Sequence, residues 1–349
     1  LVFSALTSTA FSQEIVPLFR GVRTQAMGGA GIMTANDETA ILINPAGLGK
    51  VRGRHFAVVN PQLTTTTEST AALGGTANYL AFMDLQQFLN AAKNAPNNNL
   101  FYSAQLLPAY MATNFGFGIL GSYTYKGVYD PTTTNFNVDY RNDFGTAIAY
   151  NFRFWEGRIK FGLTGKVLNR VEVQQAIPGA SVNQTFAQYA KEGTGVGFDS
   201  ALMISGPWSW LPSLSIVGHD VGQTKFTLGS GFFFKTGVTP NPQPQSIDVG
   251  LAVFPIIDPY TRMSFALEWR DAQNPETADP MRRFHAGLEM NFNDVFFLRG
   301  GWNQHYYTAG LEVSLQVIQI QLATYGEEIG TATAPKENRR YMFEFGMRM

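Results

Sequence analysis

The sequence predicts an all-β protein, an antiparallel transmembrane β-barrel of about 14 strands with an N-terminal plug, or hatch, inside its lumen. Three observations support this fold class. Apolar residues alternate with small or polar ones along most of the chain, which is the period of a strand with two different faces. The segments between these strands are alternately short and long. Only 15% of the residues are charged, whereas about a quarter are charged in ordinary soluble domains.

The composition narrows the alternatives. No stretch is apolar for the roughly 20 residues that a membrane-spanning helix needs. The nearest candidate, residues 200–218, contains Gly206, Pro207 and Pro212, which would break a helix and fit two strands around a turn. Because lipid leaves no backbone group unpaired, a closed barrel remains as the way for this chain to cross a membrane.

Charge and cysteine content exclude several kinds of function. The net charge of −1 argues against nucleic acid as a partner, since binding it requires basic patches. The chain contains no cysteine, so disulfides, thiolate metal sites and cysteine nucleophiles are excluded. The histidines, His55, His219, His285 and His305, show no metal-ligand spacing. We therefore expect neither a cofactor nor a metal.

The first residues have the features of an exported protein. Residues 1–12 are predicted to be the remnant of a signal peptide, in which an apolar run precedes the small-x-small cleavage signal Ala10-Phe11-Ser12. A buried first strand is the alternative interpretation. On the first interpretation residues 13–54 form the plug and residues 55–349 form the barrel.

The strands follow from the alternation that begins at His55. In the clearest case Phe284, Leu288 and Met290 share one face, and His285 and its alternate neighbours share the other. We expect the apolar face to contact lipid and the small or polar face to surround a plug. The predicted strands are 55–66, 102–113, 115–126, 137–152, 157–173, 195–205, 213–219, 245–254, 260–270, 282–291, 295–302, 305–315, 316–325 and 339–349.

The connections between these strands predict the orientation of the barrel. Most of them alternate between tight turns and long loops, and 127–136 is among the long ones. Outer-membrane barrels have short turns on the periplasmic side, so both termini should be periplasmic. The chain also ends in an alternating apolar tail, 341–349, similar to the C-terminal signal of outer-membrane clients, although it ends on Met rather than Phe. Aromatic residues gather near the predicted periplasmic rim, at the level of lipid headgroups: Phe152, Phe154, Trp155, Trp208, Trp210, Phe292, Phe296 and Phe297.

Two of the long loops carry helical patterns. Residues 84–93 place Leu85, Phe88 and Leu89 on one face, and residues 184–192 have a similar pattern. We expect a short helix in each loop.

A glycine-rich, nearly uncharged segment precedes the first strand. Gly28, Gly29 and Gly31 permit close packing and positive φ. Asn44-Pro45 is a cap followed by a first-turn proline, which sets a tight backbone reversal. Such a compact segment suits the inside of a barrel, where we expect it to pack against small residues such as Gly287 or Ala252.

Residues 21–48 resemble the N-terminal hatch of the FadL family of long-chain fatty acid and hydrocarbon transporters. They resemble as closely the PorV-like barrels of Bacteroidetes-type secretion systems. Asp37 and Asn44-Pro45-Ala46 match the hatch motif residue by residue. The resemblance implies a plugged lumen and passage of hydrophobic molecules from an extracellular site sideways through the wall.

In the FadL family this exit lies at a kinked third strand. The third predicted strand of this chain carries Gly116, Gly118 and Gly121, which can bend it. The alternative interpretation is that these glycines make room for the plug.

Two function classes remain, together with a weakly supported third. The first is transport of hydrophobic compounds, such as long-chain fatty acids, across the bacterial outer membrane. The second is a PorV-like shuttle or anchor that holds secreted or surface proteins without transporting anything. A membrane enzyme has little support, because no Gly-x-Ser-x-Gly elbow occurs and His219 and His305 fit loop or rim positions. Expected partners are outer-membrane lipid and lipopolysaccharide, with a hydrophobic ligand or a secreted or surface protein.

Overall fold

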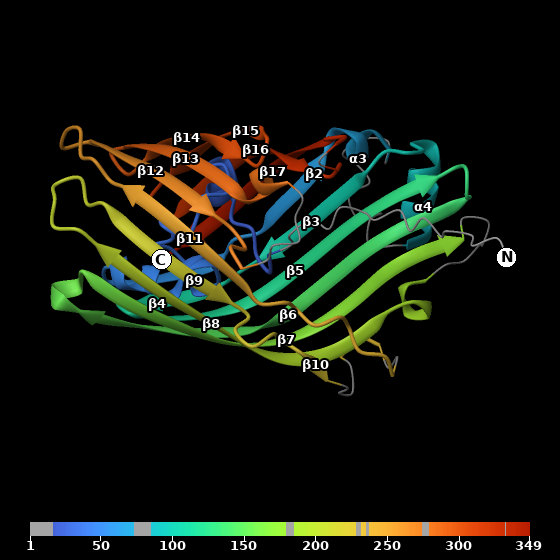
Figure 1. The fold of residues 1–349 in the computed structure, drawn as a ribbon, viewed down its shortest axis with the longest axis horizontal. Coiled ribbons are helices and arrows are strands. Elements are labelled where there is room, and N and C mark those ends of the chain that lie inside the picture. The colour runs from blue at the N-terminus through green and yellow to red at the C-terminus, as the bar shows by residue number, and fades with distance from the viewer. Residues whose placement is uncertain are drawn as a thin grey trace.

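The wall of the protein is a single closed sheet. The structure is a computed structural model. In its described residues, seventeen strands form one antiparallel sheet. The sheet closes because β17 (Glu337–Arg348) pairs with both β1 (Arg54–Val59) and β2 (Gln62–Thr66). Figure 1 shows the barrel from the side. The described residues are 17–72, 85–178, 185–227, 232–234, 237–273, 279–331 and 333–349, so the predicted signal-peptide remnant, 1–12, lies outside them.

The seventeen strands make fourteen wall strands. β1 and β2 continue each other on either side of Asn60 and Pro61, and β3 and β4 do so on either side of Leu107 and Pro108. The short β10 only adds a pairing to β8. The predicted 14-strand antiparallel barrel is confirmed. The remaining strands are β3 (Leu100–Leu106), β4 (Ala109–Ala112), β5 (Phe115–Asp130), β6 (Asn135–Phe154), β7 (Ile159–Pro178), β8 (Lys191–Ser205), β9 (Ser213–His219), β10 (Phe226–Thr227), β11 (Ser246–Val253), β12 (Thr261–Trp269), β13 (Phe284–Phe292), β14 (Phe296–Asn303), β15 (Tyr306–Ser314) and β16 (Ile318–Glu328).

The inner and outer faces of the wall alternate along the strands. In β13, His285 and Glu289 are 2% and 3% exposed and face the lumen. Large apolar side chains lie outside, where Ile148 and Leu267 are 54% and 50% exposed. A soluble barrel would bury such residues, so this outer surface is suited to lipid. No helix in the described part of the chain is both long enough and apolar enough to cross a membrane.

The barrel is taller on one side. β6 and β7 contain 20 residues each, whereas a tilted strand crosses the hydrocarbon layer in roughly 9–11 residues. The predicted long loop at 127–136 is wrong, because β5 and β6 stay paired up to Asp130 and Asn135. Their alternating pattern continues past the length that a membrane-spanning strand needs, at the end of the barrel opposite the short turns (Figure 1).

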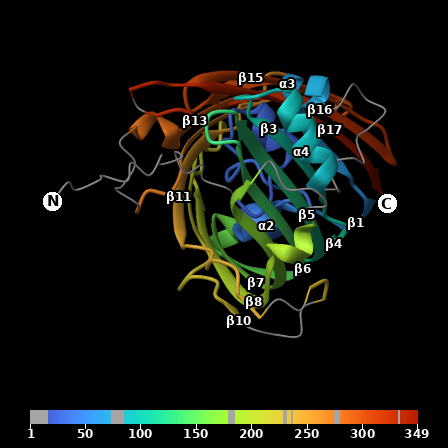
Figure 2. The same ribbon diagram turned by 90° about the vertical axis from the view of Figure 1, so that its right-hand side faces the viewer.

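One of the two predicted loop helices forms as expected. α4 (Leu85–Asn94) buries Leu85, Phe88 and Leu89 against the tall ends of β3, β5 and β6. In the second loop, the described residues 185–190 form only the three-residue 3-10 helix η4 (Phe186–Gln188). The helix α3 (Thr67–Ala72) was not predicted. Figure 2 looks along the barrel from the end that carries α3 and α4.

Candidate functional site

The plug fills the lumen of the barrel. Residues 17–53 run inside the wall and contain α1 (Val22–Ala26), α2 (Ala40–Ile43) and the 3-10 helix η1 (Pro45–Lys50) (Figures 1 and 2). Nearly all of residues 21–49 are buried. Burial of each large apolar side chain here contributes about 1.5–3 kcal/mol, which favours the plug inside the barrel. The fully buried examples include Met27, Ile32, Ile41 and Leu48.

Two plug glycines lie directly against the wall, Gly28 on its backbone and Gly29 on the side chains of His285 and Asn303. Gly28 and Gly29 follow α1 with φ of +66° and +87°. A Cβ on Gly28 would overlap the carbonyl oxygen of Ala286 and lie 2.5 Å from the backbone nitrogen of Trp302. Any side chain there would push the turn away from β13 and β14. Gly31 acts within the plug instead, because its Cβ would overlap the Thr24 side chain.

The Asn-Pro-Ala motif lies against a different part of the wall. Asn44 donates from Nδ2 to the Ile32 carbonyl (2.6 Å) and to Ser215 Oγ of β9 (3.0 Å), and its Oδ1 accepts from the Ala46 amide (3.0 Å). A Cβ on Gly162 of β7 would overlap the backbone at Pro45 and Ala46.

The expectation that this motif packs against Gly287 is wrong, whereas Ala252 belongs to the same apolar cluster as Ala46. A Cβ on Gly287 would overlap the Met27 carbonyl, so Gly287 receives the turn after α1. Sequence shows which wall positions are small, but the route of the plug across the lumen decides which of them each plug residue meets.

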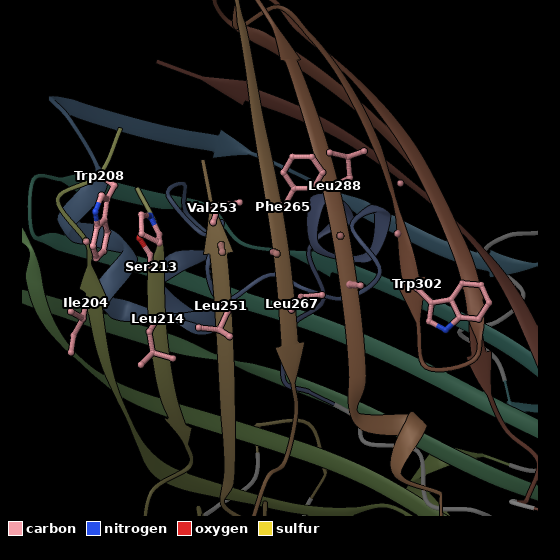
Figure 3. Close-up of a pocket in the computed structure, with 18 residues that line it drawn as sticks. Ile204, Trp208, Ser213, Leu214, Leu251, Val253, Phe265, Leu267, Leu288 and Trp302 are labelled. Atoms are coloured by element: carbon pink, nitrogen blue, oxygen red, sulfur yellow. The ribbon is translucent and has the colours of Figure 1, made fainter. Parts of the chain in front are cut away.

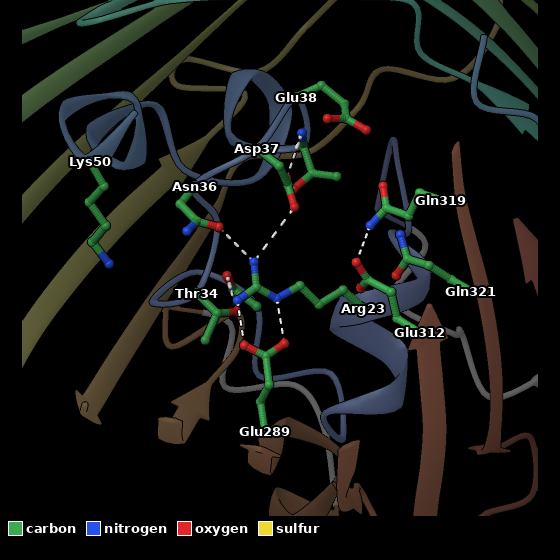
Figure 4. A network of polar contacts seen from close by, with 12 residues as sticks. Arg23, Thr34, Asn36, Asp37, Glu38, Lys50, Glu289, Glu312, Gln319 and Gln321 are labelled. Atoms are coloured by element: carbon green, nitrogen blue, oxygen red, sulfur yellow. Dashed lines mark hydrogen bonds and ion pairs between the residues drawn. The ribbon is translucent and has the colours of Figure 1, made fainter. Parts of the chain in front are cut away.

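A buried ion-pair network ties the plug to the wall (Figure 4). Arg23 of α1 donates from Nε and Nη2 to Glu289 of β13 (2.8 and 2.6 Å) and from Nη1 to Asn36 (2.6 Å). Asp37, the acidic residue of the hatch motif, lies 3.6 Å from Arg23 Nη1 and accepts from the Thr39 amide (3.0 Å). Nothing local in the sequence marks Glu289 as this partner, because several other inner-face residues, such as Glu268 and Glu312, are acidic as well.

A second ion pair ties the plug to the last strand. Glu38, 1% exposed, accepts from Arg348 Nη2 of β17 (2.9 Å) and from Asn60 Nδ2 (3.3 Å). Asn60 in turn accepts at Oδ1 from the Leu107 amide (2.8 Å). The plug is therefore connected to the two places where the wall strands are interrupted.

These interruptions lie side by side in the first and second wall strands. β1 pairs with β4, and β2 pairs with β3. No regular ladder joins the residues that separate β1 from β2 to those that separate β3 from β4. Pro61 and Pro108 have no N–H to donate, so the ladder cannot continue there. The Asn60 side chain replaces one of the missing hydrogen bonds. Leu107 is fully buried in the same apolar cluster as Ile41 of α2.

The predicted kink glycines belong to β5, which is the third wall strand. β5 stays paired with β6 along its full length. A Cβ on Gly116 would lie 2.7 Å from Ile41 Cγ1, and one on Gly118 would lie 3.2 Å from Leu107 Cδ1. Nothing lies within 4 Å of the Gly121 position. Gly116 and Gly118 thus make room for α2, and the interrupted ladder is in the neighbouring strands.

The lumen beside the start of the plug is polar. A narrow pocket of about 10 Å³, roughly the space of one water, lies next to Arg20. Arg20 donates to Glu327 (2.9 Å). Deeper along the wall Lys166 pairs with Asp199 (2.7 Å). Among the described residues, no group of three or more potential ligands could hold a metal ion. The pocket is lined by Pro17, Arg20, Thr64, Phe101, Ser103, Gln105, Thr124, Lys126 and Tyr325.

Lys50 ends the plug near the short turns. Its Nζ donates to the Met33 carbonyl (2.6 Å) and lies 4.8 Å from the centre of the Phe254 ring. Burial, together with the positive charges of Lys160 and Arg23, lowers the pKa of Lys50 to about 7. It has no carboxylate partner within the part of the chain that the structure describes.

The low pKa of Lys50 should make the folded barrel more stable as the pH rises. Between a folded pKa of about 7 and the usual value of 10.5, the unfolded chain binds a proton that the folded chain does not. Below this pH window the buried lysine is charged, and this lowers the free energy of unfolding by the full amount. As the pH rises through the window, this destabilisation is lost. We expect the melting temperature of the native barrel, relative to Lys50→Met, to rise by several degrees from pH 6 to pH 9. A constant difference would contradict this account.

Comparison with known proteins identifies the fold. No protein-family model matches the chain, and no curated protein matches its sequence. The Ralstonia pickettii toluene transporter TbuX is similar in structure, with a TM-score of 0.57 and 13% identity over 95% of this chain and 98% of that one. The CymD monoaromatic hydrocarbon channel has a TM-score of 0.56 and 10% identity, over 94% of this chain and 96% of that one. A Pseudomonas aeruginosa FadL homologue has a TM-score of 0.50 and 11% identity, over 97% of this chain and 99% of that one. The chain has the fold of the FadL-type outer-membrane barrels.

Proposed function

We propose that this protein transports hydrophobic compounds across the bacterial outer membrane through a barrel whose N-terminal plug moves during passage. The observation that carries the proposal is the contact between the plug and the interrupted wall at Asn60 and Leu107. The fold, which is shared with channels named for toluene and monoaromatic hydrocarbons, supports a small hydrophobic cargo, and long-chain fatty acids are the second cargo class.

The proposed exit is sideways, between the first and second wall strands. Two prolines remove ladder hydrogen bonds there, and one side chain, Asn60, holds the gap together from the inside. If the plug shifts, Asn60 loses its hydrogen bond to Glu38, and Leu107 loses its packing on Ile41. An apolar cargo then reaches lipid without crossing water, which saves about 25 cal/mol for each Å² of its apolar surface.

A disulfide across the interruption tests this route. The chain has no cysteine, so Asn60→Cys with Leu107→Cys introduces the only pair. We expect the oxidised barrel, reconstituted in vesicles, to lose uptake of labelled toluene or oleate, and a reductant to restore it. The matched control is Leu63→Cys with Ala104→Cys, which are partners in the regular β2–β3 ladder. Unchanged uptake in the oxidised exit pair, or equal loss in the control pair, would exclude this exit.

A second function, an anchor for secreted or surface proteins, is favoured by one observation. The plug is held to the wall by the ion pairs Arg23–Glu289 and Glu38–Arg348, in which both carboxylates are buried. An anchor needs neither a moving plug nor an apolar lumen. Absence of toluene and oleate uptake by the reduced and the native barrel alike would favour this function.

A further inference from the structure

The two halves of the plug have different partners in the wall. The first half, residues 20–33, contains α1, and the second half, residues 38–50, contains α2 and η1. Both halves bury apolar side chains in one cluster, to which Met27 and Ile41 belong. Their polar contacts with the wall differ, and this difference indicates which half a cargo can displace.

A buried ion pair holds α1 of the first half. Arg23 donates to both oxygens of Glu289 (2.8 and 2.6 Å; Figure 4), and Arg299 of β14 donates to the same carboxylate (2.6 Å). Glu289 and Arg299 are almost completely shielded from water. Removal of one partner from a buried pair leaves the other charge without compensation, which is strongly destabilising. Displacement of α1 is therefore costly.

The turn after α1 is held through its backbone. The Gly28 amide donates to Thr308 Oγ1 (2.9 Å), which itself donates to the Ala26 carbonyl (2.9 Å). The Ile32 amide donates to Glu268 of β12 (3.0 Å). An apolar molecule offers no replacement for these hydrogen bonds, and buried polar groups without a partner are costly.

The wall beside α1 carries polar side chains that bond to one another. Arg299 Nη1 donates to Gln321 of β16 (3.3 Å), and Gln321 donates to Glu344 of β17 (3.2 Å). Gln62 of β2 donates to the other oxygen of Glu344 (2.8 Å). These four residues form a polar row on the side of the lumen where α1 packs on β14, β15 and β16. A polar wall of this kind is a poor path for an apolar cargo.

The second half packs on an apolar part of the wall. Ile41 and Leu48 are fully buried, and a Cβ on Gly116 of β5 would lie 2.7 Å from Ile41 Cγ1 and 3.3 Å from Leu48 Cδ2. Thr164 Oγ1 donates to the Ile41 carbonyl (2.8 Å). The Asn114 amide donates to the Leu48 carbonyl (3.3 Å). Most of the contact is apolar, so an apolar molecule can replace it.

Strands on this side are apolar on both faces beside the plug. The large side chains of Ile204 on β8 and Leu251 on β11 point outward (Figure 3). Their neighbours on the inner face, Met203 and Ala252, belong to the same apolar cluster as the plug. This side of the lumen therefore offers the apolar surroundings that a hydrophobic cargo favours.

Few polar contacts join the second half to the first. Asn44 Nδ2, which also donates to Ser215 of β9, donates to the Ile32 carbonyl (2.6 Å). Lys50 Nζ donates to the Met33 carbonyl (2.6 Å). Each is a hydrogen bond to a neutral group, and breaking it costs less than breaking a buried ion pair.

The second half has one ion pair with the wall among the described residues. Glu38 accepts from Arg348 (2.9 Å), whose side chain is 29% exposed, so water can solvate the arginine when the pair opens. By contrast, the Arg299 side chain is 1% exposed. Glu38 also accepts from Asn60 (3.3 Å), so displacement of this half reaches the interrupted strands.

We propose that only the second half of the plug, residues 38–50, moves when a hydrophobic compound passes, and that the first half stays fixed beside the polar row. An apolar cargo makes the same kind of contact as Ile41 and Leu48, so it takes their place at the wall. It forms no hydrogen bonds, so it cannot replace the partners of Arg23 and Gly28. The cargo then lies between the second half and the apolar wall. This inference deepens the proposed function and rests on it for the identity of the cargo.

Single cysteines in the cysteine-free chain test the inference. Ala26 and Ala30 of the first half and Ala40 and Ala46 of the second half are all fully buried, so Ala→Cys at each position gives four matched reporters. Labelling by a hydrophilic methanethiosulfonate in the resting barrel measures how often each half opens. We expect the two reporters of the second half to react about tenfold faster than those of the first, and toluene or oleate to widen the ratio. Equal rates, or a faster first half, would overturn the inference.

Variants identify the contacts that hold each half. Arg23→Gln removes the ion pair of α1 and leaves Glu289 with Arg299, so it should raise labelling of Ala26→Cys toward that of Ala46→Cys. Arg23→Lys keeps the charge and serves as the control. Asn44→Ala should accelerate labelling of Ala46→Cys and leave Ala26→Cys unchanged. Folding of each variant is checked by its heat-shifted band on a gel. Unchanged labelling of Ala26→Cys in Arg23→Gln would contradict the role of the ion pair.

Uptake by the native barrel separates this inference from the proposed function. Uptake of toluene or oleate with equal labelling of the two halves would overturn the inference alone. Absence of uptake, together with faster labelling of the second half, would exclude the proposed cargo and keep the division of the plug into a fixed and a mobile half.

Discussion

Deletion of residues 21–47 is expected to convert a nearly closed barrel into an ion-conducting pore. The deleted segment carries α1, α2 and the turns that fill the lumen. The inner wall that remains is rich in polar side chains such as Glu289, Arg299 and Gln321, which water can solvate. The barrel itself should survive, because its strand pairs do not involve the plug. Conductance in a planar bilayer measures the effect.

A point variant supplies a graded version of the same test. Gly28→Ala should loosen the turn on β13 and β14 and give intermittent channel openings, because there is no space for the added Cβ. Gly121→Ala is the matched control, since nothing lies within 4 Å of that position. Equal conductance of the intact and deleted forms would show that the plug does not close the barrel.

A charge on the outer wall should strongly destabilise the barrel in lipid. Leu267 is 50% exposed on β12 and faces outward. Leu267→Arg is expected to cost about 2–4 kcal/mol if it lies near the bilayer midplane. The free energy of unfolding in lipid vesicles, obtained from denaturant titrations, measures this cost.

The control for this variant lies at the rim of the barrel, in a turn rather than in a strand. Leu211 is 46% exposed in the turn between β8 and β9, at the rim of the barrel. Leu211→Arg should cost about 0–1 kcal/mol, because the penalty falls near the interfaces. Equal costs at the two positions would mean that the outer wall does not contact the hydrocarbon layer.

Most of the wall could be predicted from the sequence because strand signals are local. Alternation over a few residues shows both that a strand forms and which side faces lipid, as His285 and Leu288 illustrate. The same local rule failed at 127–136, where a pattern that looked like a loop is the paired end of two tall strands. It also missed that Pro61 and Pro108 divide two wall strands, because the consequence depends on their meeting in adjacent strands.

The plug could be predicted in outline but not in its contacts. Its glycines and the Asn-Pro-Ala motif indicated a compact, buried segment. Its ion pairs were beyond prediction, because Arg23 meets Glu289 across 266 residues and Glu38 meets Arg348 across 310. Each charge alone is compatible with many positions, and only closure of the barrel selects the pair.

Local sequence patterns were enough to predict most of the strands, their faces, most of the short and long connections and the compact character of the first segment. These properties depend on backbone sterics and on the spacing of neighbouring side chains. Only the tertiary structure shows which wall glycine receives each turn of the plug and where the ladder is interrupted. Those outcomes depend on strands distant in sequence that become neighbours when the sheet closes.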